Sequence, residues 1–398
     1  MRILILTHSA YQRGADAVRA SLLARALVDR GHVVELVVSP AERRRRASRR
    51  LRAGLTIVTT AGLGHPALTR WGVDPLEVAS QLHLVGSGMW QVVHSFGHRP
   101  AVLLAAQRLQ RKGVVWLADW ADWWGFGGLA DHRSSLGRAF VGSWDHMLER
   151  FSRRQSDGLT VVSQYLADLA QAWGIEAWRV LRIGGGADVD GIRPAEKFES
   201  RLQWGLPPNA QFVGYSGLSA FDREHALRAF DRIAAISPGV RFLLIGGDDP
   251  WDLARRMGPS AGNRIHRLGY VQPAALGSAL ACADVMLLPL ADRASNRARF
   301  PNRLGDYLAA GRPVITNPTG EIGRIVTDNR LGRVVEESSE AMAKAAFDLL
   351  AHPDELEILG SNARAYAEKH LSWAALAARI DGHYSRLIAS GGVGSEPS

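Results

Sequence analysis

Short apolar runs alternate with helical segments along this chain, and no other feature restricts its fold as strongly. The first example is an apolar run at residues 2–7, followed by a loop, a helix that stops at Gly31, and a second run at Val33–Val38. Runs of this length are typical of buried strands, and strands that are joined by helices lie parallel in one sheet. The pattern therefore predicts an α/β fold of the doubly wound type.

The alternation occurs in two series, separated by a charged and poorly patterned segment from Asp190 to about Pro208. A chain of 398 residues also exceeds one typical hydrophobic core, so two domains are expected. We place the first domain at residues 1–195 and the second at residues 196–370, and we expect residues 391–398 to be a disordered tail. The further strands expected are Leu55–Thr59, Trp90–Ser95, Gly113–Ala118, Asp157–Ser163, Val180–Ile183, Phe212–Ser216, Arg241–Ile245, Ile265–Leu268, Val285–Pro289 and Pro313–Thr316, and the connections include a helix at Pro250–Met257.

Composition narrows the class of protein. The apolar content of 46% and the charged content of 22% are those of a soluble globular protein. There is no apolar run of about 18 residues, and the apolar N-terminal segment is too short for a signal sequence, so we expect a cytoplasmic protein. The single cysteine, Cys282, agrees with a reducing compartment. The first loop has only Arg13-Gly14-Ala15 in place of a dinucleotide-binding glycine motif, which argues against a dehydrogenase.

Much of the net charge of +9 comes from one basic block. The segment Glu42–Arg52 has seven arginines in eleven positions. Such a block can contact phosphate groups, either in the headgroups of an anionic membrane or in nucleic acid, and nucleic acid is the less favoured partner. The alternative is that Arg43–Arg52 forms a solvated helix face or a mobile loop.

The stretch 294–321 has the features of an anion site. It lies between two expected parallel strands, and a basic loop with Asn296, Arg297 and Arg299 leads to Pro301 and a short helix from Asn302 that Gly311 ends. A helix N-terminus at the carboxyl edge of a sheet attracts anions, and the arginines add to this attraction. Asp306, one turn into the helix, can accept hydrogen bonds from neutral hydroxyl groups. These groups together predict a nucleotide-sugar site, and the alternative is an ordinary strand–loop–helix connection.

A second polar stretch follows the expected strand Gly113–Ala118. It begins with Asp119, and it contains Asp122, four aromatic residues and three glycines up to Gly128. Ligands bind outside the carboxyl ends of strands in open α/β sheets, so this stretch is expected to form a sugar platform or a lid. In the alternative interpretation its tryptophans belong to the core. We select Asp119, Asp122 and His94 as candidates for positioning an acceptor or handling its proton.

The motifs resemble those of the GT-B glycosyltransferases, most closely glycosyltransferase family 4. The segments that carry the resemblance are Val92–His94, Ser156–Ser163, Arg182–Asp188, Leu244–Gly247, Leu268–Val271, Ala283–Pro289 and Gly305–Val314. The resemblance implies two Rossmann-like domains that face each other across a cleft, with a helix at residues 371–390 returning to the first domain. It implies a nucleotide-sugar donor (UDP-, GDP- or ADP-sugar) held mainly by the second domain and an unidentified acceptor on the first.

Several positions depart from the family pattern. Asp306 stands where the family has the second glutamate of its motif, which holds the ribose, and Ala298 stands where the first glutamate is expected. A basic pair after the first strand of the second domain is reduced to Arg223, so Arg299 and Arg303 are expected to supply the missing charge. The residues expected to contact the donor are Gly14, Ala15, Ser216, Gly217, Arg223, Gly246, Gly247, Tyr270, Asn296, Arg299, Asn302, Arg303 and Asp306.

The resemblance favours a glycosyltransferase that retains the anomeric configuration, acting on a glycan, a lipid-linked or a small-molecule acceptor, with no cofactor and no metal. The missing motif glutamate leaves a second hypothesis open, a catalytically weakened protein that binds sugar nucleotides. A GT-B epimerase or phosphorylase is a third, although no cofactor-lysine motif is found. The basic block adds an expectation of peripheral contact with the inner face of an anionic membrane.

Overall fold

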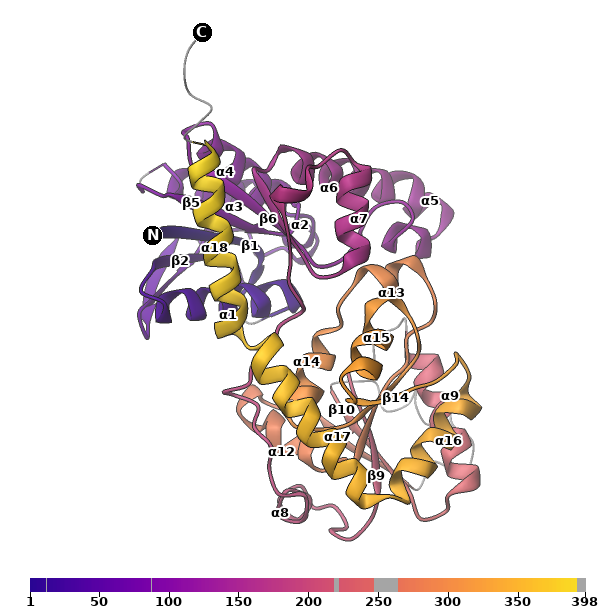
Figure 1. Cartoon of the computed structure of the whole chain (residues 1–398). Helices are drawn as coiled ribbons and strands as arrows, with labels where there is room; N and C mark the ends of the chain where they lie inside the picture. The colour runs from indigo at the N-terminus through magenta and orange to yellow at the C-terminus, as the bar shows by residue number, and fades with distance from the viewer. Residues whose placement is uncertain (12, 87, 218–221, 247–263, 392–398) are drawn as a thin grey trace. The chain divides into compact units, whose positions relative to one another are not determined.

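The computed structural model describes residues 1–11, 13–86, 88–217, 222–246 and 264–391, apart from the side chain of Arg223. These residues form two compact units (Figure 1). Unit 1 comprises Met1–Gly185 and the C-terminal segment from Trp373, and unit 2 comprises Gly186–Ser372.

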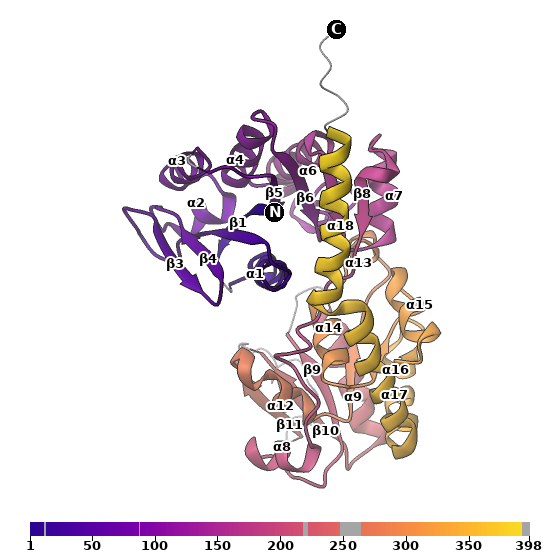
Figure 2. The ribbon, with the colours of Figure 1, turned by 60° about the vertical axis from the view of Figure 1, so that its left-hand side comes forward.

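Unit 1 is built on a sheet of eight strands in the order β3-β4-β2-β1-β5-β6-β7-β8. The strands are β1 (Arg2–Ala10), β2 (Val33–Ser39), β3 (Ser48–Arg52), β4 (Leu55–Thr59), β5 (Val92–Phe96), β6 (Val115–Trp120), β7 (Gly158–Val161) and β8 (Val180–Arg182). The helices are α1 (Ala15–Asp29), α2 (Pro66–Trp71), α3 (Pro75–Leu84), α4 (Pro100–Gln110), α5 (Ser135–Gly137), α6 (Ser143–Gln155), α7 (Gln164–Ala172) and α18 (Trp373–Gly391). All neighbouring strands pair in parallel except β3, which is antiparallel to β4 at the edge of the sheet (Figure 2).

Unit 2 is built on a parallel sheet of six strands in the order β11-β10-β9-β12-β13-β14. The strands are β9 (Phe212–Ser216), β10 (Arg241–Ile245), β11 (Ile265–Gly269), β12 (Val285–Leu288), β13 (Val314–Thr316) and β14 (Gly332–Val334). The helices are α8 (Lys197–Gln203), α9 (Arg223–Ile236), α12 (Leu276–Ala281), α13 (Ala294–Ala298), α14 (Asn302–Ala309), α15 (Gly320–Asp328), α16 (Ser339–Leu350) and α17 (Pro353–Tyr366). This strand order is that of a doubly wound sheet, so the predicted fold class is confirmed.

The C-terminal helix α18 belongs to the core of unit 1. Its apolar side chains Leu376, Ile380 and Tyr384 are fully buried, and they share one cluster with Leu23 and Leu27 of α1. The helix therefore covers the sheet of the first unit although its residues come last in the chain, as the resemblance implied (Figure 1). No helix in the described part of the chain is both long and apolar enough to cross a bilayer.

The division of the chain differs from the predicted boundary at residue 195. Residues 186–195 group with unit 2, because the Ala187 N–H donates to the Leu371 carbonyl at 2.8 Å and Arg364 donates to the carbonyls of Val189 and Ile192. These contacts hold the segment against α17 and the turn after it. This segment has no periodic apolar pattern, because its contacts are made by backbone carbonyls.

Other local predictions need correction. The alternative interpretation of the basic block was a helix face or a loop, but residues 48–52 form the edge strand β3, because the following segment Leu55–Thr59 offers a hydrogen-bonding partner. The loop expected at Asn296–Arg299 contains the short helix α13. The helix predicted at Pro250–Met257 and the tail at 392–398 lie outside the described residues, and Gly391 is the last residue of α18.

Removing buried volume from α18 should destabilise unit 1. Ile380→Ala should lower the free energy of unfolding by about 3 kcal/mol, because a buried isoleucine loses its transfer energy and leaves a cavity. The exposed Ser385→Ala on the same helix should change it by less than about 0.5 kcal/mol. Urea denaturation followed by tryptophan fluorescence measures both variants, and equal effects would contradict a structural role for the buried face of α18.

Candidate functional site

The strand order of unit 2 reverses between β9 and β12, and ligands of doubly wound sheets bind at the carboxyl edge at such a reversal. Ser216 is the last residue of β9, and the chain that leaves β12 forms α13 and α14. The fold therefore brings the predicted stretch 294–321 to the position where a ligand is expected.

Helix α14 is short and closely held. Pro301 precedes its first residue, and Gly311 follows its end with φ of +66° and donates to the Leu308 carbonyl at 3.0 Å. At Gly305 a Cβ atom would lie 2.3 Å from the carbonyl oxygen of Gly186, so only glycine allows this approach of the helix to the backbone. The helix, its start and its glycine stop agree with the prediction.

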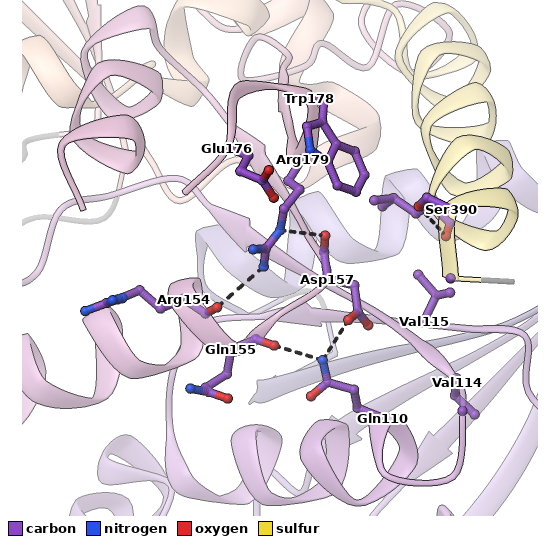
Figure 3. Close-up of a pocket in the computed structure, with 13 residues that line it drawn as sticks. Gln110, Val114, Val115, Arg154, Gln155, Asp157, Glu176, Trp178, Arg179 and Ser390 are labelled. Carbon is purple, nitrogen blue, oxygen red and sulfur yellow. Dashed lines mark hydrogen bonds between the residues drawn. The ribbon is translucent and has the colours of Figure 1, made fainter. Parts of the chain in front are cut away.

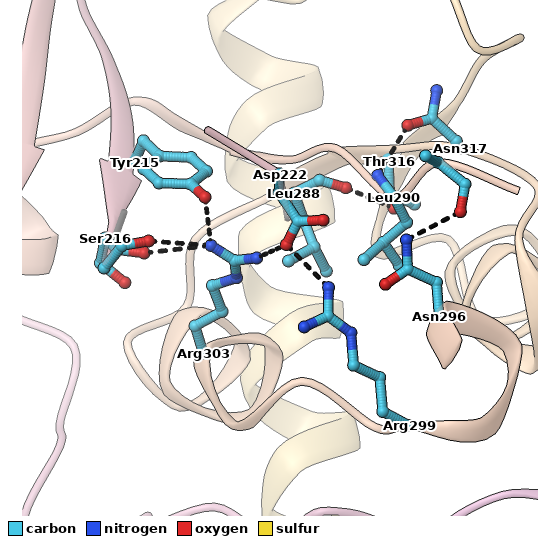
Figure 4. Close-up of polar contacts among 12 residues, drawn as sticks. Tyr215, Ser216, Asp222, Leu288, Leu290, Asn296, Arg299, Arg303, Thr316 and Asn317 are labelled. Carbon is cyan, nitrogen blue, oxygen red and sulfur yellow. Dashed lines mark hydrogen bonds and ion pairs between the residues drawn. The ribbon is translucent and has the colours of Figure 1, made fainter. Parts of the chain in front are cut away.

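Two arginines of this stretch share one carboxylate (Figure 4). Arg299 donates to Asp222 at 2.8 Å, and Arg303 forms an ion pair with the same oxygen. Arg303 also donates to the Tyr215 hydroxyl and to the Gly217 carbonyl at 3.0 Å. The Asp222 side chain is fully buried, whereas those of Arg299 and Arg303 are 16% and 11% exposed. The arrangement fixes both guanidinium groups at the carboxyl end of β9.

One carboxylate does not neutralise two guanidinium groups. The cluster of Arg299, Arg303 and Asp222 keeps one positive charge, and the Nε–H of Arg299 has no acceptor among the described residues. An arginine has five N–H donors in a planar fork, which suits the paired oxygens of a phosphate. The cluster can therefore hold an anion without reorganising its side chains.

Asp306 lies on α14 three residues beyond Arg303. Its side chain is partly buried, and no hydrogen bond to its carboxylate is found in the described part of the chain. Burial raises the pKa of Asp306 to about 7, and the nearby Asp188 carboxylate adds to the rise. The ionised form of a buried carboxyl group without hydrogen-bond donors is stabilised by any hydroxyl groups that donate to it.

The other predicted donor contacts lie at the same edge. Asn296 is buried and donates to the Ala291 carbonyl at 2.8 Å, while Asn302 is exposed at the start of α14. Gly246 and the largely exposed Tyr270 directly follow β10 and β11. Gly247 and the side chain of Arg223 lie outside the described residues. The predicted loop residue Arg297 instead pairs with Asp292 at 2.6 Å, away from the Arg299–Arg303 cluster.

Three residues of the site were not selected from the sequence. Asp222 holds the two arginines, the Tyr215 hydroxyl accepts from Arg303, and the Tyr307 hydroxyl accepts from the Ser216 N–H at 2.8 Å. A signal was present for Asp222, because two arginines near a sheet edge need a counter-charge, and it lies in the loop after β9.

In unit 1, Asp119 and His94 form a buried network. Arg19 donates to both oxygens of Asp119, Thr160 donates to Asp119 at 2.7 Å, and His94 Nε2 lies 3.2 Å from the Thr160 hydroxyl. The other ring nitrogen of His94 lies 2.8 Å from the Tyr384 hydroxyl on α18. Burial alone would raise the pKa of Asp119, but the Arg19 guanidinium holds it below its usual value. Burial lowers the pKa of His94 to about 4.

This network has no exposed face for an acceptor, because His94 is completely buried and Asp119 is 3% exposed. The structure gives both residues a supporting role. Arg19 also donates to the carbonyls of Gly184 and Gly185 at 3.0 and 2.8 Å. The network therefore holds the end of the segment Met1–Gly185 in place.

The tryptophan stretch at the end of β6 and just after it is largely part of the core. Trp120 is fully buried and stacks on Trp173 with ring centroids 4.9 Å apart, and Trp123 is 9% exposed. Glu149 of α6 accepts hydrogen bonds from the Trp120 indole N–H and the Gly125 backbone N–H, both at 2.8 Å. The core alternative is therefore favoured over a mobile lid. Asp122 of this stretch is half-buried, and its contact with an acceptor stays a prediction.

The remaining predicted donor residues, Gly14 and Ala15, lie at the exposed N-terminus of α1 after β1. Gly14 has φ of +86°, a conformation that favours glycine. A large pocket of about 610 Å³ in unit 1 lies at the opposite edge, among Val115, Asp157, Trp178 and Arg179 at the amino ends of β6, β7 and β8 (Figure 3). Its position at the amino ends of the strands gives it no relation to the expected ligand edge. Among the described residues, no group of three or more acidic, histidine or cysteine side chains could hold a metal ion.

Comparisons with known sequences agree with this architecture. The sequence model described as "Glycosyl transferase 4-like domain" matches residues 14–186, and the model described as "Glycosyl transferases group 1" matches residues 222–352. Two doubly wound units, the second with a basic ligand edge, define a protein of the GT-B class. The chain belongs to the GT-B glycosyltransferases of the family 4 type.

Among curated relatives, the chain is 30% identical over 244 residues to the D-inositol 3-phosphate glycosyltransferase 2 of Catenulispora acidiphila, a match that covers 56% of this chain and 55% of that protein. It is 28% identical over 233 residues to the phosphatidyl-myo-inositol mannosyltransferase of Mycolicibacterium smegmatis, covering 57% of each. The match thus spans little more than half the length of these relatives.

Two solved structures show the same fold. The sucrose-phosphate synthase of Thermosynechococcus elongatus has a TM-score of 0.79 at 19% identity, covering 98% of this chain and all of that one. Anabaena HepE in complex with UDP-glucose has a TM-score of 0.70 at 18% identity, covering 97% of this chain and all of that one.

Removing the shared carboxylate should destabilise unit 2. Asp222→Ala should lower the free energy of unfolding by about 3 kcal/mol, because two largely buried guanidinium groups lose their counter-charge. Glu357→Ala, an exposed carboxylate on α17, should change it by less than about 0.5 kcal/mol. Guanidinium chloride is unsuitable because it screens charge, so urea denaturation is the measurement. A stable Asp222→Ala protein would show that the arginines do not depend on this carboxylate.

Proposed function

We propose that this protein is a glycosyltransferase that binds a nucleotide-sugar through unit 2 and transfers the sugar to an acceptor hydroxyl group. One observation carries the proposal: Arg299, Arg303 and Asp306 lie together on the carboxyl edge of a parallel sheet, where its strand order reverses. Cationic donors for a diphosphate beside a carboxyl group for ribose hydroxyls match the two chemically distinct parts of a nucleotide-sugar.

Each group has a separate role in the proposal. The guanidinium groups of Arg299 and Arg303 bind the diphosphate and stabilise the negative charge that grows on it as it departs. Asp222 positions both of them and does not touch the substrate. Asp306 accepts hydrogen bonds from the ribose hydroxyl groups. These hydrogen bonds replace those with the water that is lost on binding.

In the proposed reaction, the bond from the anomeric carbon to the diphosphate oxygen breaks as the acceptor oxygen forms its bond to the same carbon. The acceptor proton passes to the departing phosphate oxygen, so the nucleoside diphosphate serves as the base. The acceptor attacks from the same face from which the diphosphate departs, and the anomeric configuration is therefore retained. This route needs neither a metal ion nor an enzymic nucleophile, and the main contribution of the protein is electrostatic.

The names of the relatives guide the choice of substrates. The two relatives above are named for acceptors that carry inositol phosphate, free or lipid-linked, and HepE was solved with UDP-glucose. We therefore propose a UDP- or GDP-hexose donor before an ADP-sugar, and a polyol or lipid-linked acceptor. A cytoplasmic location with peripheral contact between Arg43–Arg52 and an anionic membrane belongs to this proposal, and the exposed side chains of β3 support it.

The second candidate is a protein that binds a sugar nucleotide but turns it over weakly. The observation in its favour is that the position of the first motif glutamate is Ala298, which is completely buried. A carboxylate that contacts the donor sugar in related enzymes is therefore missing from this chain. Binding of a donor without transfer to any acceptor would favour this candidate.

Donor binding should depend on the arginine cluster. In isothermal titration with UDP-, GDP- and ADP-glucose, Arg303→Ala should weaken binding of the preferred donor by about tenfold to a hundredfold, because it removes charge-assisted hydrogen bonds to phosphate. Arg303→Lys should weaken it less, since it keeps the charge and loses only the fork. The control is Arg232→Ala, an exposed arginine of α9 paired with Glu340.

A thermal unfolding curve of each variant separates loss of binding from loss of folding. If Arg303→Ala folds normally and binds every donor as tightly as the Arg232→Ala control, the donor site is not at this cluster.

Donor affinity should also vary with pH through Asp306. Its pKa in the free protein is about 7, and ribose hydroxyls favour the ionised form, so binding lowers this pKa. Affinity should then rise between about pH 6 and about pH 8 and level off above this range. The phosphates of a nucleotide-sugar stay ionised throughout and add no dependence of their own. Asp306→Asn should bind more weakly with a flat profile; the same rise in this variant would remove Asp306 from the site.

A further inference from the structure

A basic pocket of about 270 Å³ lies in unit 1, whereas the Arg299–Arg303 cluster belongs to unit 2. Ala10, Ser39 and Thr59, the last residues of three neighbouring strands β1, β2 and β4, line it. The pocket is therefore at the carboxyl edge of this sheet, where doubly wound folds place their ligands. Figure 2 shows one of them, β4, beside the edge strand β3.

Three arginines line the pocket, Arg13, Arg43 and Arg44. Arg13 and Arg43 are exposed, and no ion pair or side-chain hydrogen bond is found for either within the described residues. Arg44 is half-buried and donates to the Ser48 hydroxyl at 2.8 Å. The carboxylate in the lining is that of Glu42, so the pocket keeps an excess of positive charge.

The backbone that carries Arg43 and Arg44 is held in place. Arg44 and Gly62 form an isolated antiparallel bridge, in which each N–H donates to the other carbonyl at 2.8 Å. At Gly64, with φ of +69°, a Cβ atom would lie 2.2 Å from the Arg43 backbone nitrogen. The loop thus packs directly on a glycine backbone, which holds the backbone that carries the two arginines at the pocket.

We propose that this pocket binds the phosphate group of a phosphorylated acceptor. That the phosphate belongs to an acceptor rests on the proposed function, whereas the binding of phosphate rests on the pocket alone. Three guanidinium groups against one carboxylate leave two positive charges, which attract the phosphate of a monoester or of a diester. The pocket volume accommodates this group and a small part of the polyol that carries it. The phosphate belongs either to a soluble polyol phosphate or to a lipid headgroup.

The test is titration of the full-length protein with sn-glycerol 3-phosphate, without any nucleotide-sugar. Arg43→Gln should weaken binding by about tenfold or more, because it removes a charge-assisted hydrogen bond from an exposed side chain that folding does not need. The matched control is Arg50→Gln, an exposed arginine of the same basic block on β3 that does not line the pocket. It should keep the wild-type affinity within about twofold.

Two results would overturn the proposal. An equal loss in Arg43→Gln and Arg50→Gln would mean that the whole block attracts anions and that the pocket selects none. Equal affinity for glycerate, which has the same skeleton with a carboxylate, would remove the preference for phosphate. A tighter wild-type complex with glycerol 3-phosphate, lost in Arg43→Gln, supports it.

Vesicles distinguish the source of the phosphate. Phosphatidylcholine vesicles with phosphatidylglycerol should bind the wild-type protein more tightly than vesicles without it, and Arg43→Gln should lose this difference, if the phosphate is in a lipid headgroup. Wild-type binding to glycerol 3-phosphate with no preference between the vesicles supports a soluble acceptor. If Arg50→Gln loses this preference for anionic vesicles as strongly as Arg43→Gln does, the membrane contact is made by the whole exposed block. This result would contradict binding of a lipid phosphate in the pocket.

Kinetics separate this inference from the proposed function. With a phosphorylated acceptor, Arg43→Gln should raise KM for the acceptor by about tenfold and leave KM for the donor unchanged. A raised KM for the donor would assign the pocket to the donor and overturn the acceptor role. Absence of donor binding in the wild-type protein would refute the proposed function, but glycerol 3-phosphate binding that depends on Arg43 would still establish the phosphate pocket.

Discussion

The ligand edge of unit 2 depends on one buried carboxylate. Asp222 accepts from Arg299 and forms an ion pair with Arg303, and it thereby places two guanidinium groups against the end of β9. Two like charges this close repel each other, so without the carboxylate they would separate or draw in water. Because the carboxylate supplies one charge and the arginines two, the group remains attractive to an anion. The contact that holds the two arginines in place therefore also sets the charge that they present.

Unit 1 uses a buried ion pair for another purpose. Arg19 and Asp119 lie inside the unit, and their contacts reach the carbonyls of Gly184 and Gly185 and, through Thr160 and His94, the hydroxyl of Tyr384 on α18. A buried pair of this kind is retained only when its remaining hydrogen-bonding groups are satisfied. Here they are satisfied by segments far apart in the sequence, which ties the last helix to the first sheet.

Much of the fold was predictable, because it depends on local patterns. Buried strands such as Val285–Leu288 read as short apolar runs, and α14 is marked by Pro301 before it and Gly311 after it. The edge that we propose for the donor was predicted for the same reason, since motif spacing and basic residues are visible in the sequence. The edge strand β3 was missed because its run of arginines has no apolar alternation, and it pairs with β4 at the edge of the sheet.

The sequence by itself determined the α/β class, the two series of strands, the GT-B resemblance and the position of Asp306 and its neighbouring arginines. Only the tertiary structure decided which polar residues meet a ligand edge and which support the core. Asp119 and His94 looked catalytic, yet they are buried with partners, whereas Asp222, unselected, holds the arginines. The physical reason is that the partners of a charged side chain come from segments remote in sequence, and they fix its burial, its pKa and its access to a ligand.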